Sequence, residues 1–102
     1  MTEIKKEKST LKVKATTNPN ILAGAICKDI EKGVDCELVA IGSGPISQAV
    51  KAIIVTNRLV ASSGKTVYTR PSFQTLKLKK VVDGKEEDVD ITAIKFKIIV
   101  EE

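Results

Sequence analysis

The stretch from Ala40 to Val60 constrains the fold more than any other part of the chain. It reads as the end of a strand, a Gly-Ser-Gly-Pro turn and a long helix. Pro45 suits the first turn of a helix, where its missing N–H would have no partner. Apolar residues recur at helical spacing on one face of this helix: Ile46, Ala49, Val50, Ile53 and Ile54. Others lie off that face: Ala52, Val55, Leu59 and Val60. A helix that is apolar on several sides needs cover on several sides, from a sheet, a second helix or another subunit.

Length and composition restrict the class of protein. A chain of 102 residues is long enough for one domain with one two-layer core. Its 42% apolar and 29% charged residues indicate a globular domain rather than a disordered one. Aromatic residues make up only 3%, so the core must be aliphatic and few side chains can stack on bases. A net charge of +4 permits a polyanionic partner without requiring one.

The first half of the chain alternates strands with helices. Leu11–Thr17 has apolar residues at every second position, which predicts a half-buried strand. Asn18 and Pro19 are suited to the start of a helix, and Gly33 is suited to its end. The apolar stripe predicted for this helix consists of Ile21, Leu22, Ala25, Ile26 and Ile30. Cys36–Ile41 is almost wholly apolar and predicts a strand near the centre of the sheet.

The second half of the chain contains strands only. Ser62-Ser63-Gly64 ends the long helix, and Thr66–Val82 is extended, with a break or bend expected at Pro71. Ile91–Val100 is the last strand, and the acidic segment DGKEEDVD between the two strands is expected to be a solvated hairpin tip rather than a calcium loop. We therefore expect an α+β fold, a two-layer β-α-β-α-β-β sandwich. Both helices would lie on one face of a four-stranded mixed sheet. Residues 1–10 would form a flexible tail, and residues 11–102 the domain.

Strand alternation gathers the lysines on one surface. If the apolar residues face the helices, the open face of the sheet receives Lys12, Lys14, Lys77, Lys79, Lys95 and Lys97. The segment from Lys65 to Val82 also contains Arg70 and has no acidic residue, because the acids lie beyond it in the hairpin tip. We interpret this as segregated charge. Two readings remain open, a phosphate-contacting surface or a polar face whose lysines protect sheet edges from aggregation.

The Gly42-Ser43-Gly44 turn is open to two readings of the same kind. Backbone N–H groups at the start of a helix attract phosphate. The turn lacks the lysine and Ser/Thr of a P-loop and the third glycine of a dinucleotide fingerprint, so a plain strand-to-helix turn is the alternative. Gln48 and Lys51 follow within the first two turns and would either extend an anion-binding surface or form a solvated side of the helix.

No constellation for catalysis is present. There is no histidine, and the two cysteines, Cys27 and Cys36, have no zinc spacing, so both are expected to be small buried side chains or free thiols. We expect no metal, no cofactor and no enzymatic activity. Because the chain has no signal peptide and no apolar run long enough for a transmembrane helix, a cytoplasmic location is expected.

The segments AIGSGPISQAVKAI and VASSGKTVYTRPSF resemble the stage V sporulation protein S family. The helix opening PNILAGAI and the ending TAIKFKIIV fit the same pattern, so the resemblance covers about Leu11 to Val100. The family is associated with sporulation and developmental regulation in bacteria, and its fold is similar to that of Alba, an archaeal chromatin and RNA-binding protein. The resemblance implies a homodimer, a last strand inserted between the second and third, and nucleic-acid binding.

These observations lead to two functional hypotheses. The first is a non-enzymatic regulator that binds DNA or RNA through backbone phosphates with little sequence preference. Its candidate contacts are Gly42, Ser43, Gly44, Gln48 and Lys51, with Lys12, Lys14, Arg70, Lys77 and Lys79 as secondary candidates. The alternative is a protein-protein interaction module in which the apolar surface of the long helix and an unpaired hairpin edge serve as docking sites. We expect no membrane partner and no small-molecule substrate.

Overall fold

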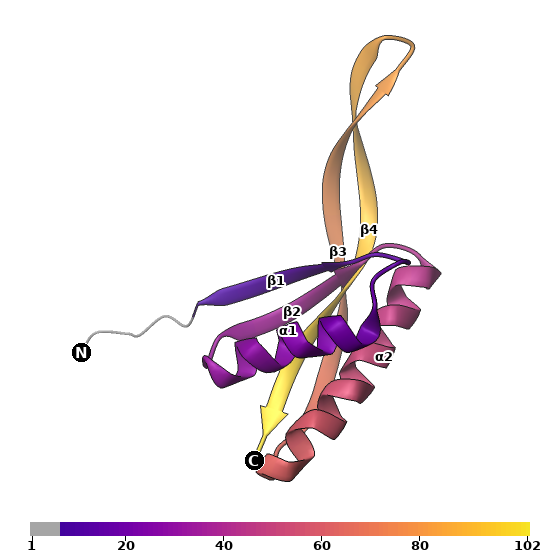
Figure 1. The fold of residues 1–102 in the computed structure, drawn as a ribbon. Helices are drawn as coiled ribbons and strands as arrows, with labels where there is room; N and C mark the ends of the chain where they lie inside the picture. The colour runs from indigo at the N-terminus through magenta and orange to yellow at the C-terminus, as the bar shows by residue number, and fades with distance from the viewer. Residues whose placement is uncertain (1–6) are drawn as a thin grey trace, which may run out of the picture.

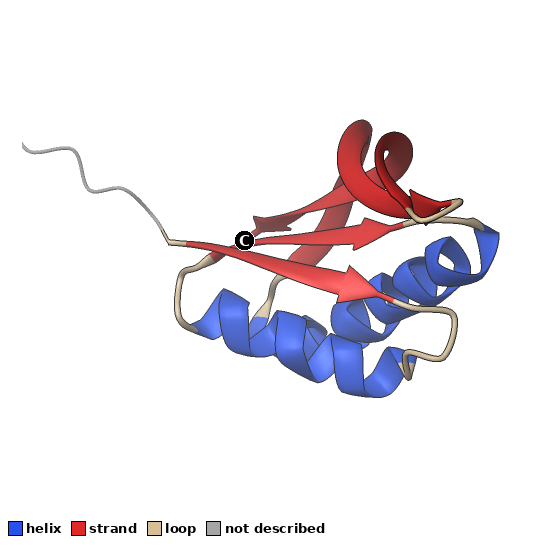
Figure 2. Ribbon diagram, turned by 90° about the horizontal axis from the view of Figure 1, so that it is seen from above, coloured by secondary structure: helices blue, strands red, loops and turns tan. Residues whose placement is uncertain are grey.

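A computed structural model describes residues 7–102. The elements follow the order β1-α1-β2-α2-β3-β4, with a short 3-10 turn after α2. Their bounds are β1 Lys8–Val13, α1 Pro19–Glu31, β2 Asp35–Ala40, α2 Ser43–Val60, the turn Ala61–Ser63, β3 Thr66–Val82 and β4 Lys85–Glu101. Both helices cover one face of the sheet, and the other face is open (Figure 2). The predicted two-layer α+β architecture is confirmed.

The sheet has four strands in the order β1-β2-β4-β3. β1 pairs with β2 in parallel, whereas β4 is antiparallel to both β2 and β3. The sheet is therefore mixed, and its last strand lies between the second and third, as the family resemblance implied. β1 and β3 form the two edges.

The two helices begin and end where local sequence signals predict. Asn18 caps α1, because its Oδ1 accepts hydrogen bonds from the backbone N–H groups of Asn20 at 2.8 Å and Ile21 at 3.4 Å. After α1, Gly33 takes a φ of 69°, and Gly64 takes 72° after the turn that follows α2. Both values lie in the left-handed region that glycine adopts without strain.

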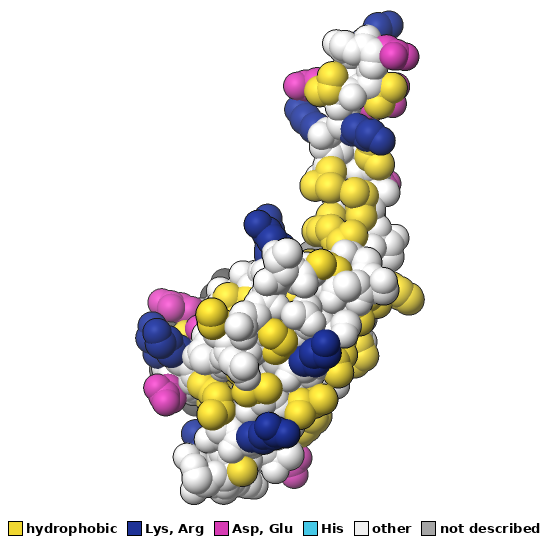
Figure 3. Space-filling view, turned by 45° about the vertical axis from the view of Figure 1, so that its right-hand side comes forward, with side chains coloured by type: hydrophobic (Ala, Val, Ile, Leu, Met, Phe, Trp, Pro, Cys, Tyr) yellow, Lys and Arg dark blue, Asp and Glu magenta, His cyan; other side chains and the backbone are white. Residues whose placement is uncertain are grey.

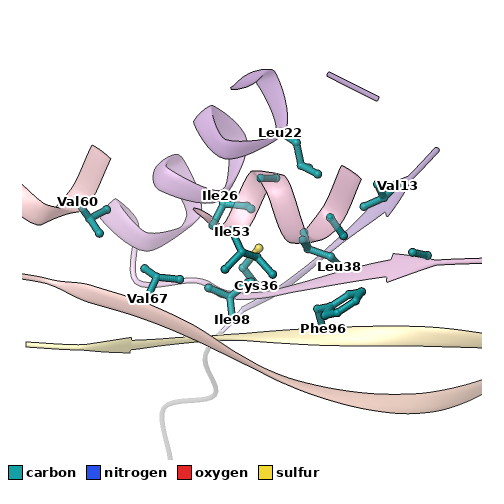
Figure 4. Close-up of a cluster of buried hydrophobic side chains, with 13 residues drawn as sticks. Val13, Leu22, Ile26, Cys36, Leu38, Ile53, Val60, Val67, Phe96 and Ile98 are labelled. Atoms are coloured by element: carbon teal, nitrogen blue, oxygen red, sulfur yellow. The ribbon is translucent and has the colours of Figure 1, made fainter. Parts of the chain in front are cut away.

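The core lies between the helices and the sheet, and its side chains are almost all aliphatic (Figure 4). Ile26 and Leu38 are fully buried, and Phe96 is the one aromatic residue of the buried cluster. Small residues permit close packing of α1 on α2, since Ala23, Ala49 and Ala52 are all fully buried. The predicted helix faces are confirmed only in part: Ile21 of α1 and Val50 and Ile54 of α2, all placed on the apolar faces, are exposed, whereas Ala52 and Val60, placed off the face of α2, are buried.

The predicted bounds of the first two strands require correction. β1 begins at Lys8 rather than Leu11 and ends at Val13, because residues 14–17 form a turn closed by a hydrogen bond from the Thr17 N–H to the Lys14 carbonyl. Lys8–Thr10 therefore belong to the sheet, Glu7 precedes them as a described residue outside the strand, and residues 1–6 of the predicted tail lie outside the described residues. β2 is shifted by one residue to Asp35–Ala40.

Pro71 does not break β3, which runs without interruption from Thr66 to Val82. Proline has no backbone N–H to donate. An edge strand tolerates it, because on its solvent side the strand has no neighbour that needs a hydrogen bond. The register continues through this position, with Pro71 opposite Phe96.

The β3–β4 hairpin is much longer than the strands beside it. β2 pairs with β4 only from Ile94 to Lys97, so residues 74–82 and 85–93 extend beyond the sheet as a two-stranded arm (Figure 1). The arm leaves the sheet on the side away from the helices (Figure 2). Its turn consists of Asp83 and Gly84 alone, so the acidic segment predicted to be the hairpin tip lies mostly within β4.

Candidate nucleic-acid interface

The structure brings the leading candidate residues together at one end of the sheet. β1 and β2 are parallel, so the segments that follow Val13 and Ala40 emerge at the same edge. We call this edge the carboxyl end, meaning Lys12, Lys14, the loop of residues 15–18, Gly42–Gly44, Gln48 and Lys51. The arm rises from the same end of the molecule, since Ala40 lies opposite Ile94 at its base.

A hydrogen bond joins the two loops of the carboxyl end. The Gln48 amide Nε2 donates to the Thr17 carbonyl at 2.8 Å, and its Oε1 accepts from Lys51 Nζ at 3.4 Å. Gly44 lies so close to the first loop that a Cβ at this position would be 3.1 Å from the Cβ of Ala15. Gln48 and Gly44 therefore hold the start of α2 against the loop of residues 15–18. Lys51, on the same helix beside Gln48, is exposed.

The N-terminus of α2 differs from that of α1. Within residues 7–102, no side chain caps α2, and no acidic residue lies in its first turn. Its N-cap residue is Gly42, whose φ of 93° is a conformation that side-chain-bearing residues rarely adopt. The positive end of the α2 dipole, carried by backbone N–H groups, is thus left to solvent or to an anion.

An apolar groove lies between the carboxyl end and the arm, with a volume of about 380 Å³. It is lined by Lys12, Val13, Lys14, Ala15, Val39, Ile41, Pro45, Leu76 and Leu78. None of these residues, all of them in the described part of the chain, is acidic. Among residues 7–102, neither Lys12 nor Lys14 forms an ion pair. The carboxyl end therefore presents cations without neighbouring carboxylates.

The centre of the open face has a different electrostatic character. Glu37 is only 7% exposed, and it forms ion pairs with Lys8 at 3.2 Å and Lys95 at 3.9 Å. Its Oε1 also accepts a hydrogen bond from Thr10 at 3.0 Å, and Lys97 lies opposite it in the register. We call these five residues the Glu37 cluster. One buried carboxylate thus offsets part of the positive charge that the open face was predicted to carry.

Arg70 lies on the open face but away from the carboxyl end. It is opposite Lys97 in the β3–β4 register, so two cations face each other across the hairpin. Like charges in directly opposed positions repel, and an anion between them would relieve this repulsion. Arg70 therefore belongs beside the Glu37 cluster rather than with Lys12 and Lys14.

The prediction that charge is segregated along the hairpin is wrong. Acidic residues of β4 oppose the lysines of β3: Lys77 with Asp90, Lys79 with Asp88, and Lys80 with Glu87. Lys79 also forms an ion pair with Glu86 at 3.9 Å. The acids come after the turn in sequence, but antiparallel pairing folds them back onto the lysines.

Lys77 and Lys79 also lie on the other side of β3 from the one predicted. Cross-strand partners share a face, and Thr69 opposes the core residue Ile98, whereas Arg70 opposes Lys97. Counting by twos, Lys77 and Lys79 share the side of Thr69, and Leu76 and Leu78 share the side of Arg70. The two leucines therefore face the groove instead of the helices.

Sequence reasoning missed Glu37 and the groove. Glu37 was visible as the single acid within an apolar strand, a position at which an unpaired carboxylate would be costly. That signal predicts cationic neighbours but does not identify them. The groove had no sequence signal, because Val13, Ile41 and Leu78 come from three separate segments.

Neither cysteine has the environment of a nucleophile. Both are free, and the pKa of Cys36 is raised to about 12, mainly by burial and to a smaller extent by the hydrogen bond and charge of Asp29 and by the charge of Glu37. Burial, together with the charge of Glu31, also raises the pKa of Cys27. No cluster of three or more potential metal ligands occurs in the part of the chain that the structure describes. Neither described helix has the length and apolarity required to cross a membrane.

Fold and site together define a small two-layer α+β domain with an uncapped helix terminus and uncompensated lysines at one end. The chain belongs to the SpoVS family: the model of stage V sporulation protein S matches residues 9–101, nearly the whole length. Membership supports a role related to sporulation, and the family is not one of known enzymes.

Proposed function

We propose that this protein is a non-enzymatic regulator that binds DNA or RNA through backbone phosphates with little sequence preference. The observation that carries the proposal is the carboxyl end, where Lys12, Lys14 and Lys51 meet the uncapped N-terminus of α2. Lysines release counterions when they neutralise phosphates, and a helix N-terminus adds backbone donors and a positive partial charge.

Weak sequence preference follows from how the helices are placed. Both helices lie against the sheet, so neither projects as an element that could read base edges in a groove (Figure 1). Phosphate contacts fix position on a nucleic acid but carry no direct sequence information. The expected behaviour is binding that depends on charge and salt more than on sequence.

The absence of enzymatic activity is part of the same proposal. The sequence has no histidine, and the Cys36 thiol, with a pKa of about 12, is almost wholly protonated near neutral pH. A general base and an activated nucleophile are the usual requirements of hydrolytic and transfer chemistry. Binding is therefore the activity that these side chains support.

Homodimer formation is supported by apolar side chains that the monomer leaves uncovered. Val50 and Ile54 of α2 are 43% and 53% exposed, and Phe73 of β3 is 81% exposed. Figure 3 shows hydrophobic side chains along the arm and down the flank of the body below it. Contiguous apolar surface of this kind marks interaction sites. Ile54→Lys should shift the sedimentation coefficient toward the monomer, whereas Arg58→Gln on the same helix should leave it unchanged.

Fluorescence anisotropy with a labelled duplex and a labelled RNA tests nucleic-acid binding directly. At low salt we expect a dissociation constant on the order of micromolar, weakening by at least about tenfold when salt is raised fourfold. No binding of DNA or RNA at low salt would overturn the proposal.

A protein-interaction module is the second candidate, and the exposure of Phe73 favours it. Pull-down from a cell lysate with and without nuclease distinguishes the two functions. A partner that is retained after complete digestion and lost with Phe73→Ser supports the second candidate.

A further inference from the structure

The apolar groove beside the carboxyl end has the composition of a ligand site rather than of an ordinary solvated surface. Its floor and walls are aliphatic, from Val39 and Ile41 of the sheet end, Pro45 of α2 and Leu76 and Leu78 of the arm. Ile41 and Leu78 are 43% and 44% exposed, so their side chains are accessible to a ligand. The volume of about 380 Å³ falls within the range of small-molecule sites, about 300–1,000 Å³.

Cations flank this groove at its edge. Lys12 and Lys14 both line it, and Pro45, in the first turn of α2, places the uncapped helix terminus beside it. A ligand that fits must therefore combine a flat or compact apolar part with an anionic part on the same side. A nucleotide unit has this combination, since its base has apolar faces and its phosphate is anionic.

We propose that the groove receives one unstacked base of a single-stranded nucleic acid, while the adjoining phosphates lie against Lys12, Lys14 and the N-terminus of α2. The inference rests on the proposed function and specifies its substrate class. A duplex keeps its bases paired and stacked, so it offers phosphates to the lysines but no base to the groove. The aliphatic walls contact either face of a base without reading its edge, which keeps the site tolerant of sequence.

Other occupants fit the groove less well. A second copy of this chain does not need the groove, because the apolar residues that support a homodimer, Val50, Ile54 and Phe73, do not line it. An acidic apolar peptide would satisfy the charge, but a nucleic-acid strand carries one phosphate beside every base, so the anionic and apolar parts recur together along it. Both alternatives are outcomes of the test below.

The test compares three probes of about 12 nucleotides each: oligo(dT), an abasic strand of the same length and charge, and a duplex. The abasic strand and the duplex report the phosphate contacts alone. We expect the wild-type protein to bind oligo(dT) about fivefold more tightly than the abasic strand. Leu78→Gln should remove this difference while leaving the affinities for the abasic strand and the duplex unchanged.

Val81→Gln is the matched control, because Val81 is 67% exposed on the same arm and does not line the groove. It should behave as wild type with all three probes, and circular dichroism should show both variants folded. Equal affinity of the wild type for oligo(dT) and the abasic strand overturns the inference and leaves the proposed function standing. Failure of all three probes to bind rejects both.

Two further results would assign the groove to another occupant and overturn the inference. The first is a change of sedimentation coefficient in Leu78→Gln but not in Val81→Gln, which indicates a second copy. The second is a labelled acidic apolar peptide that binds wild type, is lost with Leu78→Gln and is not displaced by oligo(dT).

Discussion

The Glu37 cluster and the carboxyl end both contain several lysines, yet their local charges differ. In the cluster, Lys8 and Lys95 share one buried carboxylate. At the carboxyl end, Lys12 and Lys14 have no ion-pair partner in the described chain and lie beside a helix terminus of positive partial charge. The difference teaches that the lysine count of a surface says little about its affinity for anions until the positions of the carboxylates are known.

The arm repeats this lesson in a second form. Lys77 and Lys79 belong to the most basic segment of the sequence, but Asp90 and Asp88 oppose them across the hairpin. Exposed pairs of this kind contribute little to stability, about 0–1 kcal/mol each. Their effect is electrostatic, since they lower the positive charge that the arm presents to a polyanion. By contrast, the lysines of the carboxyl end that line the groove have neither an ion pair nor an acid opposite them in the described strands.

The largest effect is expected from removing the cations of the carboxyl end. Lys12→Gln with Lys14→Gln should weaken binding to nucleic acid by about tenfold and lower the slope of log affinity against log salt by about two. The matched control is Lys77→Gln with Lys79→Gln, which removes the same charge from the arm. Its affinity should change by less than about twofold. Equal losses in the two double variants would show that net charge, not the carboxyl end, determines binding.

A smaller effect is expected when an acid is placed at the N-terminus of α2. Ser43→Asp should raise the free energy of unfolding by about 0.5 kcal/mol, because a carboxylate interacts favourably with the positive end of the helix dipole. The same carboxylate should weaken nucleic-acid binding by about threefold to fivefold, since it occupies the place of a phosphate. Denaturant titration and anisotropy measure the two quantities.

Ser43→Asn is the control for this prediction, because it matches the shape of aspartate without its charge. It should leave the affinity at the wild-type value. A Ser43→Asp variant that is more stable and binds as well as wild type would show that the N-terminus of α2 does not contact the bound phosphates.

A third variant tests the Glu37 cluster, the region that was compared with the carboxyl end. Glu37→Gln should release Lys8 and Lys95 and raise the affinity for a polyanion by about twofold. It should also lower the free energy of unfolding by about 1–2 kcal/mol, because charged hydrogen-bond partners at a buried site are lost. Glu86→Gln, which removes an exposed pair to Lys79, should change stability by less than about 0.5 kcal/mol. Unchanged affinity in Glu37→Gln would mean that the bound polyanion lies too far from the Glu37 cluster to interact with its charges.

The last prediction concerns the reactivity of Cys36, a core residue next to Glu37 in β2, and involves no change in affinity. The pKa of Cys36 is raised from 9.0 to about 12, so the reactive thiolate is a minor form at pH 8. Alkylation of Cys36 by iodoacetamide should therefore be much slower than that of a free thiol and should accelerate steadily from pH 8 to beyond pH 9. Peptide mass spectrometry of partially labelled protein gives the rate. Rapid labelling of folded protein at pH 8 would contradict the buried, carboxylate-flanked environment of this thiol.

Local sequence signals predicted most of the fold. Asn18, Pro19, Gly33 and Gly64 fixed the helix boundaries, because caps and left-handed positions depend on neighbours within a few residues. The turn Gly42–Gly44 and the lysines Lys12 and Lys14 were also identified from the sequence as candidate contacts. Their convergence follows from the parallel pairing of β1 and β2, an arrangement that requires a crossover connection such as α1.

Predictions that depended on how distant strands pair were less accurate. The face of Lys77 and Lys79 was inferred from the assumption that Leu76 and Leu78 lie on the helices. The arm extends beyond the sheet, so its leucines face a groove instead. Pro71 was given too much weight, because β3 is an edge strand and an edge strand tolerates proline.

The amino-acid sequence by itself determined where each helix starts and stops, the alternation along each strand and the absence of histidine. Each of these depends on residue type and on contacts between near neighbours. The tertiary structure alone decided which lysines have a carboxylate beside them. That outcome depends on the pairing of β1, β2 and β4, which brings Glu37 to Lys8 and Lys95 from distant parts of the chain. Because Coulomb energy falls with distance in space rather than in sequence, only the folded chain separates a compensated surface from an anion-attracting one.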